Sequence, residues 1–264
     1  MSERIVVEIT DHVAQVTLNR SEKHNAVDAA MFDAIIETGA ALSADASVRA
    51  VVLTGSGDNF CAGIDVSTFT DSGVSPARMQ PLEGSPANYF QSAAYVWRSM
   101  PVPVIAALRG VVFGAGFQIA MGADLRIASA DMKMSIMETK WGLIPDMGIS
   151  ALLPAILPYD RAAELTWTGR IVAAEEAKAL GLLTAIADDP LAHARELAAE
   201  VAARSPDAVR AAKRLLQQSY EERDERLLAL EADLQMRVMA GANQKEAVAA
   251  NVEQRAPVFT DPRN

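Results

Sequence analysis

The sequence predicts an α/β fold in which a sheet core is followed by a helical tail. Short apolar runs alternate with helical patterns up to Ala151, two glycine-rich turns each follow a strand-like run, and the pattern beyond Ala151 is strongly helical. The chain has 264 residues, of which 50% are hydrophobic, which suits one core domain with an appendage. We expect a core over residues 1–200 and a helical region over 201–264 that serves assembly.

The first elements follow from apolar runs and a capping residue. Residues 4–9 and 13–18 are short apolar runs separated by a polar turn, which predicts a hairpin. Asp28 precedes a helical pattern that continues to about Leu42, so it is the expected N-cap. The β-branched run 48–54 predicts a buried strand.

The remaining elements are less sharply marked. Before Ala151 we expect, in order, a surface loop over 68–88, a helix over 86–100, a strand over 104–108, a helix over 115–122, and extended segments over 124–128 and 132–137. After Ala151 we expect helices that stop at Pro154, Pro158, Gly169, Gly181, Pro190 and Pro206.

Composition excludes several classes of protein. The net charge of −10 argues against a nucleic-acid partner, which would need a basic face. No apolar run is long enough to cross a bilayer, and no charged and apolar leader precedes Ile5, so we expect no membrane partner. The single cysteine, Cys61, suits a reducing compartment, and we expect a cytoplasmic enzyme of bacterial type. The three histidines are not spaced for metal binding, so we expect no metal.

Two turns rich in small residues carry the strongest chemical signal. Gly55–Asp65 (GSGDNFCAGID) and Gly110–Gln118 (GVVFGAGFQ) each follow an apolar strand-like run. Small residues let backbone approach a ligand closely, and the free N–H groups of two such turns can converge on one oxygen. This arrangement predicts an oxyanion hole that stabilises a thioester enolate or a related anion. The simpler interpretation is that both are ordinary glycine turns.

Nucleotide-binding motifs do not fit the second turn. In a dinucleotide fingerprint a third small residue would stand where Ile119 stands, and no acidic partner follows in a βαβ unit. A phosphate loop is also excluded, because no Gly-Lys-Ser/Thr ends the turn.

Four segments together resemble the crotonase superfamily, that is, the enoyl-CoA hydratase/isomerase fold. They are NRSEKHNAV (19–27), NFCAGID (59–65), GVVFGAGFQIAMGADLRIAS (110–129) and METKWGLIPDMG (137–148), in the same order and spacing. The resemblance implies a ClpP/crotonase-like spiral ββα core with a C-terminal helical trimerisation region. It also implies a homotrimer or homohexamer and an acyl-CoA thioester substrate. No cofactor is implied, since coenzyme A is part of the substrate.

The resemblance also implies which residues hold the substrate. The oxyanion hole would be formed by the backbone N–H groups of Ile64 and Ala115. Ala26, Ala62 and Asp65 match positions that wrap the coenzyme A moiety largely through backbone. Lys23 and Arg20 flank the segment that lines the adenine and phosphate region. The full set expected to bind the substrate or its coenzyme A is Lys23, Ala26, Ala62, Asp65, Val66, Phe113 and Pro145.

The catalytic carboxylates depart from the hydratase pattern. Hydratases of this family use two glutamates; the later one is present as Glu138, and Gln118 stands at the position of the earlier one. A glutamine amide can hold a water or a carbonyl, but it cannot exchange protons near neutral pH. Asp146 follows Glu138 by eight residues, where the dienoyl-CoA isomerase branch has a proton-shuttling aspartate. We expect Glu138 and Asp146 to face one pocket and titrate as a pair.

Several alternatives remain open. Asp146 is also the nucleophile position of the 4-chlorobenzoyl-CoA dehalogenase branch. That branch needs a histidine on the helix before Pro101 and a tryptophan in place of Glu138, and neither is present. Asp146 as a loop cap is the simpler interpretation. Hydration, isomerisation and catalytically silent acyl-CoA binding therefore compete.

The other conspicuous side chains are expected to be structural. Cys61 has no histidine near it in sequence and is expected to pack rather than react. Trp97 and Trp141 are expected in the core or in the acyl-pocket wall. The leucines of the amphipathic tail are expected on an oligomer or core face; they are Leu227, Leu228, Leu230 and Leu234.

Overall fold

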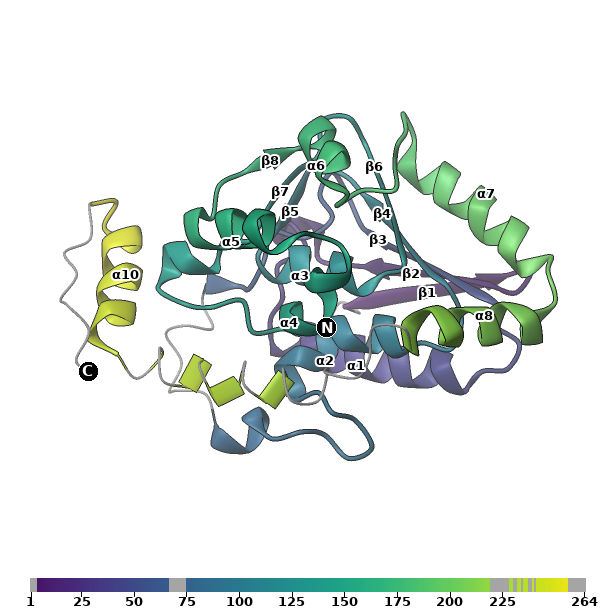
Figure 1. Cartoon of the computed structure of the whole chain (residues 1–264), viewed down its shortest axis with the longest axis horizontal. Helices are drawn as coiled ribbons and strands as arrows, with labels where there is room; N and C mark the ends of the chain where they lie inside the picture. The colour runs from purple at the N-terminus through teal and green to yellow at the C-terminus, as the bar shows by residue number, and fades with distance from the viewer. Residues whose placement is uncertain are drawn as a thin grey trace.

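The computed structural model describes residues 4–66, 75–218, 228–229, 232–233, 235–236, 239 and 241–255. A six-stranded sheet forms its centre (Figure 1). Its strands are, in spatial order, β1 (Ile5–Thr10), β2 (Val13–Leu18), β3 (Ala50–Gly55), β4 (Val104–Leu108), β6 (Leu125–Ala128) and β9 (Ala185–Ile186). The hairpin pair β1 and β2 is antiparallel, and every later neighbour pairs in parallel.

A second, smaller sheet lies beside the first. It contains β5 (Val111–Phe113), β7 (Lys133–Ser135) and β8 (Val172–Ala173), and an isolated parallel bridge joins Cys61 to β5. Twice in succession, a strand of the large sheet is followed by a strand of the small sheet and then by a helix. The first unit is β4, β5 and α3 (Ala115–Gly122), and the second is β6, β7 and the 3-10 helix η4 (Glu138–Trp141). This repeated ββα order matches the predicted α/β fold class.

Helices cover both faces of the large sheet. On one face α7 (Pro190–Ala202) places Ala194 and Ala198 against Ala50 and Val52 of β3. The other face belongs to the main core, against which α1 (Ala29–Ala44), α2 (Tyr89–Ser99) and α3 pack (Figure 1). Because both faces are buried, β3 is apolar at successive positions instead of alternating with polar residues.

The predicted N-terminal elements are confirmed. Asp28 caps α1 by accepting a hydrogen bond from the Met31 N–H at 2.9 Å, and it also forms a 2.7 Å ion pair with Arg4. The helix expected over 86–100 begins at Tyr89 instead, because Asn88 and Gln91 form a reciprocal capping box at its start.

The sequence analysis missed three strands. β5, β8 and β9 contain two or three residues each, too few to show an alternating pattern, and β8 and β9 interrupt the region expected to be helical. Pro190 and Pro206 begin α7 and α8 (Pro206–Gln218) rather than ending helices, since proline fits the first helical position. The other helices after Ala151, or close to it, are α4 (Ile149–Leu152), η5 (Leu153–Ala155), α5 (Tyr159–Thr168), α6 (Ala174–Leu180) and α10 (Ala242–Val252).

Short 3-10 helices occupy two other segments. η1 (Ser21–Lys23) follows β2, and η3 (Pro76–Met79) lies within the expected 68–88 loop. Residues 67–74 of that loop lie outside the described residues.

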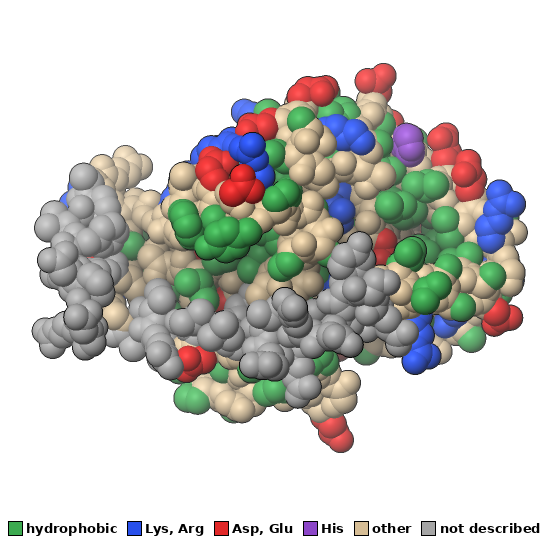
Figure 2. Space-filling model, viewed as in Figure 1, with side chains coloured by type: hydrophobic (Ala, Val, Ile, Leu, Met, Phe, Trp, Pro, Cys, Tyr) green, Lys and Arg blue, Asp and Glu red, His purple; other side chains and the backbone are tan. Residues whose placement is uncertain are grey.

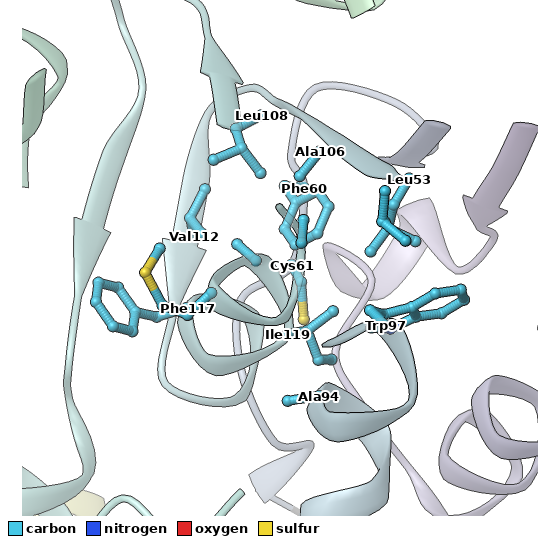
Figure 3. Packing of buried hydrophobic residues seen from close by; sticks show 14 of the residues in the cluster. Leu53, Phe60, Cys61, Ala94, Trp97, Ala106, Leu108, Val112, Phe117 and Ile119 are labelled. Atoms are coloured by element: carbon cyan, nitrogen blue, oxygen red, sulfur yellow. The ribbon is translucent and has the colours of Figure 1, made fainter. Parts of the chain in front are cut away.

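The core beneath the two glycine-rich turns is tightly packed. Figure 3 shows Cys61, Ile119 and Trp97 among the buried side chains that join β3, β4 and α3. Trp97 therefore belongs to the core and not to the cavity wall. Burial raises the pKa of the Cys61 thiol to about 12, so the thiol stays protonated and packs as a small apolar group.

A buried ion pair attaches α8 to the core. The Lys213 ammonium is 2.7 Å from Asp124 Oδ2 and 2.9 Å from the Val102 carbonyl oxygen, and Asp124 Oδ2 also accepts the Val104 N–H. Burial lowers the pKa of Lys213, and the Asp124 carboxylate opposes that shift. These bonds fix the first helix after residue 200 to the large sheet.

The rest of the tail is described in part. Leu228 is buried, and its carbonyl oxygen accepts a hydrogen bond from Gln91 Nε2 at 2.7 Å. Leu227, Leu230 and Leu234 lie outside the described residues. The expected domain boundary at residue 200 falls inside α7, and the division itself stays a prediction.

The described surface mixes both signs of charge. Acidic and basic side chains are interspersed over the face shown in Figure 2. Among the described helices, none is long and apolar enough to cross a membrane.

Replacing Lys213 with methionine is expected to lower the free energy of unfolding by about 3 kcal/mol, because the Asp124 carboxylate and the Val102 carbonyl lose their buried donor. Urea denaturation at fixed protein concentration measures the change. Arg161→Met in α5 is the control, since that side chain is 58% exposed. Equal stability of the two variants would contradict the role given to the Lys213 ion pair.

Candidate active site

A cavity of about 790 Å³ lies where the two glycine-rich turns meet. Its wall includes Ile64, Ala115, Glu138 and Asp146, which come from segments far apart in sequence. Much of the apolar wall is supplied by α1, α2 and η4, together with Met79, Leu143 and Met147. The cavity is therefore built from the predicted catalytic segments and from helices that pack over them.

The small sheet brings the reactive segments together. Cys61 pairs in parallel with Val112, and Ile64 and Ala115 each lie three residues beyond that pair. β5 and β7 are also parallel, with Phe113 opposite Ser135, and Glu138 lies three residues beyond Ser135. All three residues consequently lie just beyond the carboxyl ends of segments that pair in parallel, the usual place for ligand sites in parallel sheets.

Two glycines allow the turns to approach each other. Gly63 has φ of 109° and Gly114 has φ of 51°, conformations that a side chain disfavours. A Cβ atom on Gly114 would lie 3.9 Å from Gly63 Cα and 3.5 Å from Glu138 Oε1. Those distances are ordinary contacts, so Gly114 is needed for its backbone conformation, whereas a Cβ atom on Gly63 would lie only 3.2 Å from the Phe113 carbonyl oxygen.

The backbone N–H groups of Ile64 and Ala115 are available to a ligand. Val27 donates its N–H to the Gly63 carbonyl and accepts the Asp65 N–H, so the Ile64 N–H points to the opposite side of that segment. Ala115 opens α3, where a first-turn N–H has no partner within the helix. Within the part of the chain that the structure describes, neither nitrogen donates a hydrogen bond. Both residues line the cavity.

Glu138 lies close to the second turn, with its Oε1 3.5 Å from where a Cβ atom on Gly114 would be. Its Oε1 accepts a 2.6 Å hydrogen bond from Gln118 Nε2, and its Oε2 is shielded from solvent without a hydrogen-bond partner among the described residues. Desolvation raises the pKa of Glu138 to about 7; the backbone N–H groups of Glu138 and Met137 and the Gln118 amide oppose the rise. A carboxyl with that pKa can both accept and return a proton near neutral pH.

Gln118 is buried behind Glu138, and each end of its amide makes one hydrogen bond. Its Oε1 accepts the Met147 N–H at 2.8 Å, and its Nε2 donates to Glu138. These two bonds connect Glu138 to the loop that carries Asp146. Gln118 is not part of the described cavity wall, and the expected contact of its amide with a water or a substrate carbonyl stays a prediction.

Asp146 faces the same cavity as Glu138. It directly precedes Met147, whose N–H is accepted by Gln118 Oε1, so the amide that donates to Glu138 also fixes this loop. Glu138 and Asp146 therefore face one cavity, and the Gln118 side chain links the two segments that carry them.

The other predicted binding residues divide into two groups. Ala62 and Val66 line the cavity. Lys23 is exposed on η1, the Ala26 carbonyl accepts Arg20 Nη1 at 3.0 Å, and Asp65 pairs with Arg20 at 2.7 Å. Phe113 and Pro145 are not part of the cavity wall that the structure describes.

Sequence reasoning missed most of the apolar wall. Phe32, Tyr89 and Phe90 line the cavity from α1 and α2, together with Arg78 and Met79 of η3. Trp141 also lines it, which confirms one of its two expected places. Nothing in the spacing of these residues points to a common pocket, because helix packing and not sequence distance brings them together.

The chain belongs to the enoyl-CoA hydratase/isomerase family. The sequence model of that family matches residues 8–262. An enoyl-CoA hydratase of Mycobacterium tuberculosis, EchA19, is 32% identical over 256 residues, covering 96% of this chain and 95% of the relative. A 1,2-epoxyphenylacetyl-CoA isomerase of Escherichia coli is 32% identical over 263 residues, covering 98% of this chain and 99% of the relative.

Solved structures agree with this assignment. An enoyl-CoA hydratase/isomerase from Pseudoalteromonas atlantica superposes with a TM-score of 0.86 at 29% identity, covering 97% of this chain and 100% of that one. The predicted crotonase superfamily and its fold are therefore confirmed, and the family processes acyl-CoA thioesters.

The raised pKa of Glu138 predicts a specific dependence of stability on pH. Between the ordinary pKa of about 4.5 and the folded-state pKa of about 7, the folded chain holds a proton that the unfolded chain releases, so stability falls as pH rises through this window. Glu138→Gln removes this effect while it preserves an acceptor for Gln118. The Tm of the variant relative to the natural protein is expected to increase from pH 4.5 to pH 7 and to be constant above that.

Calorimetry over that range measures the difference in Tm. Glu175→Gln on the exposed face of α6 is the control and should show no such trend. A difference that is constant with pH for Glu138→Gln would show that Glu138 titrates normally.

Proposed function

We infer that this protein is an acyl-CoA isomerase that moves a double bond in an unsaturated thioester by removing and returning a proton. The observation that supports this most strongly is the Gln118 amide, which stands in place of the second carboxylate of a hydratase, cannot exchange protons near neutral pH, and is buried outside the described cavity wall. In this site the pKa of Glu138 is raised to about 7, and an amide stands where a hydratase has its second carboxylate. Such a site suits proton transfer better than the activation of water.

The proposed reaction begins at the thioester carbonyl. The N–H groups of Ile64 and Ala115 donate hydrogen bonds to the carbonyl oxygen, where negative charge develops as the enolate forms. The Glu138 carboxylate takes a proton from a carbon next to the double bond, and the electron pair of that C–H bond moves into the conjugated enolate. The same proton, or one from Asp146, then returns to a different carbon, so the product is an isomer of the substrate.

Asp146 is proposed as the second proton carrier. It faces the cavity with Glu138, and Gln118 holds the adjoining Met147 N–H. Two carboxyl groups in one cavity give a donor and an acceptor on different sides of an acyl chain, which a dienoyl substrate requires. Their titration is expected to be coupled.

Hydration is the second candidate activity. Several relatives carry the name enoyl-CoA hydratase, including EchA19 of Mycobacterium tuberculosis. In that case Asp146 would activate the water, because the Gln118 amide cannot take a proton from it. A silent acyl-CoA binder is disfavoured by Glu138, because a binder has no need for a shielded carboxyl with a raised pKa.

Further features of the protein are part of the same proposal. The coenzyme A moiety would lie along the backbone of Ala62 and Val66, with Lys23 near its phosphates. The chain would assemble as a homotrimer or homohexamer through its C-terminal helices and act in the cytoplasm, without a separate cofactor.

An isotope experiment separates isomerisation from hydration. The protein is incubated with 2-enoyl-, 3-enoyl- and 3,5-dienoyl-CoA in water labelled with deuterium and with oxygen-18, and the products are analysed by mass spectrometry. We expect an isomerised product without labelled oxygen, with deuterium in the acyl chain to the extent that the transferred proton exchanges with solvent. Labelled oxygen at the 3-carbon would identify a hydratase, and no change in any substrate would leave only binding.

Loss of either carboxyl group is expected to reduce turnover unequally. Glu138→Gln should lower kcat by at least about 100-fold, since it removes the proton acceptor. Asp146→Asn should lower kcat most for dienoyl substrates, which need a second proton carrier. Glu175→Gln serves as the matched control. Full activity of both cavity variants would refute the proposed pair.

A further inference from the structure

Part of the cavity wall is a fixed aromatic cluster. The ring centroids of Phe32, Tyr89 and Phe90 are 5.2 to 5.5 Å apart, and Phe90 meets both of the other rings nearly edge to face. All three rings line the cavity. Such packing restricts the rotation of each ring, so this wall has a defined shape before any substrate binds.

Tyr89 is held most firmly in this cluster. Its hydroxyl donates toward Asp33 Oδ1 at 2.8 Å, and the Ala29 carbonyl oxygen lies 3.2 Å from it. The hydroxyl bonds attach α2 to the first turn of α1. The Tyr89 ring is therefore held in one orientation.

The guanidinium of Arg78 stacks on the Tyr89 ring. Its guanidinium carbon is 4.5 Å from the centroid of the Tyr89 ring, within the range of a cation–π interaction. Arg78 also lines the cavity, and no described carboxylate forms an ion pair with it. The nearby Asp33 carboxylate accepts the Tyr89 hydroxyl instead. A stacked guanidinium keeps the N–H groups at its edge free to bind an anion through two parallel hydrogen bonds.

We propose that Arg78, stacked on Tyr89, binds a second carboxylate at the far end of the acyl chain, so that the substrate is the thioester of a dicarboxylic acid. The inference rests on the proposed function, since it names the substrate class of the same cavity. A phosphate of coenzyme A is the other anion that a guanidinium could bind. Arg78 itself is exposed, but the Tyr89 ring beneath it packs against Phe32 and Phe90, and this aromatic cluster favours the carboxylate because it suits an acyl chain and not a hydrated phosphate and ribose.

Binding of saturated thioesters tests this proposal without any reaction. Isothermal titration calorimetry compares pairs of equal chain length that end in a carboxylate or a methyl group: succinyl- with butanoyl-CoA, adipoyl- with hexanoyl-CoA, and suberoyl- with octanoyl-CoA, with free coenzyme A as a third ligand. We expect the natural protein to prefer the carboxylate-ended member of at least one pair by about tenfold or more. In Arg78→Gln the affinities for the two members should converge.

The controls separate the two anions and the two proposals. Arg161→Gln on α5 is the matched surface control and should keep the preference. The proposal is overturned if the natural protein shows no preference in any pair, or if Arg78→Gln weakens free coenzyme A as much as adipoyl-CoA. A preserved preference without turnover of any unsaturated thioester would overturn the proposed function and leave the Arg78 site intact.

Discussion

The parallel pairing of Cys61 with Val112 is the constraint on which the rest of the site depends. It sets two turns in register, so that two N–H groups which follow the paired residues at the same interval face one cavity. The next parallel pair, Phe113 with Ser135, brings Glu138 to the same edge. A slip of this register would separate the hydrogen-bond donors from the base, whatever the side chains were. The glycines at 63 and 114 then serve a geometric purpose, since they adopt the positive φ angles that the backbone needs where these segments meet.

The buried amide of Gln118 organises the second half of the site. A glutamate at this position could not be ionised beside Glu138 without strong repulsion, so one of the two carboxyl groups would have to hold a proton. The neutral amide avoids this repulsion. It donates to Glu138 and accepts from the Met147 backbone, so a single side chain orients the base and fixes the loop of Asp146. At this position the chain therefore has a side chain that cannot transfer protons but that connects Glu138 to the loop of Asp146.

Much of this could be predicted from the sequence, and the reason differs from part to part. The hairpin, the Asp28 cap and strand β3 depend on local pattern, and they appear as expected. The two turns and Glu138 were found because glycine and carboxylate residues carry chemistry in short motifs. Strands β5, β8 and β9 are too short to leave a pattern, and their pairing depends on distant partners.

Other parts of the site could not be found in the sequence at all. The Gln118 hydrogen bonds join residues 20 and 29 positions apart, so they are invisible before the chain is folded. The same holds for the aromatic wall, where Phe32 and Tyr89 meet because α1 packs on α2. Arg78 gave no signal, since a lone arginine in a polar loop resembles any solvated side chain. Tertiary packing, and not residue type, decides these contacts.

Isotope-edited infrared spectroscopy of a bound, unreactive acyl-CoA carrying a carbon-13 label at the thioester carbonyl tests the central claim most directly. If the Ile64 and Ala115 N–H groups donate to that oxygen, the carbonyl stretch should shift to a clearly lower frequency than in water, because two fixed donors weaken the C=O bond. A stretch at or above its frequency in water would show that the two amides do not converge on the carbonyl.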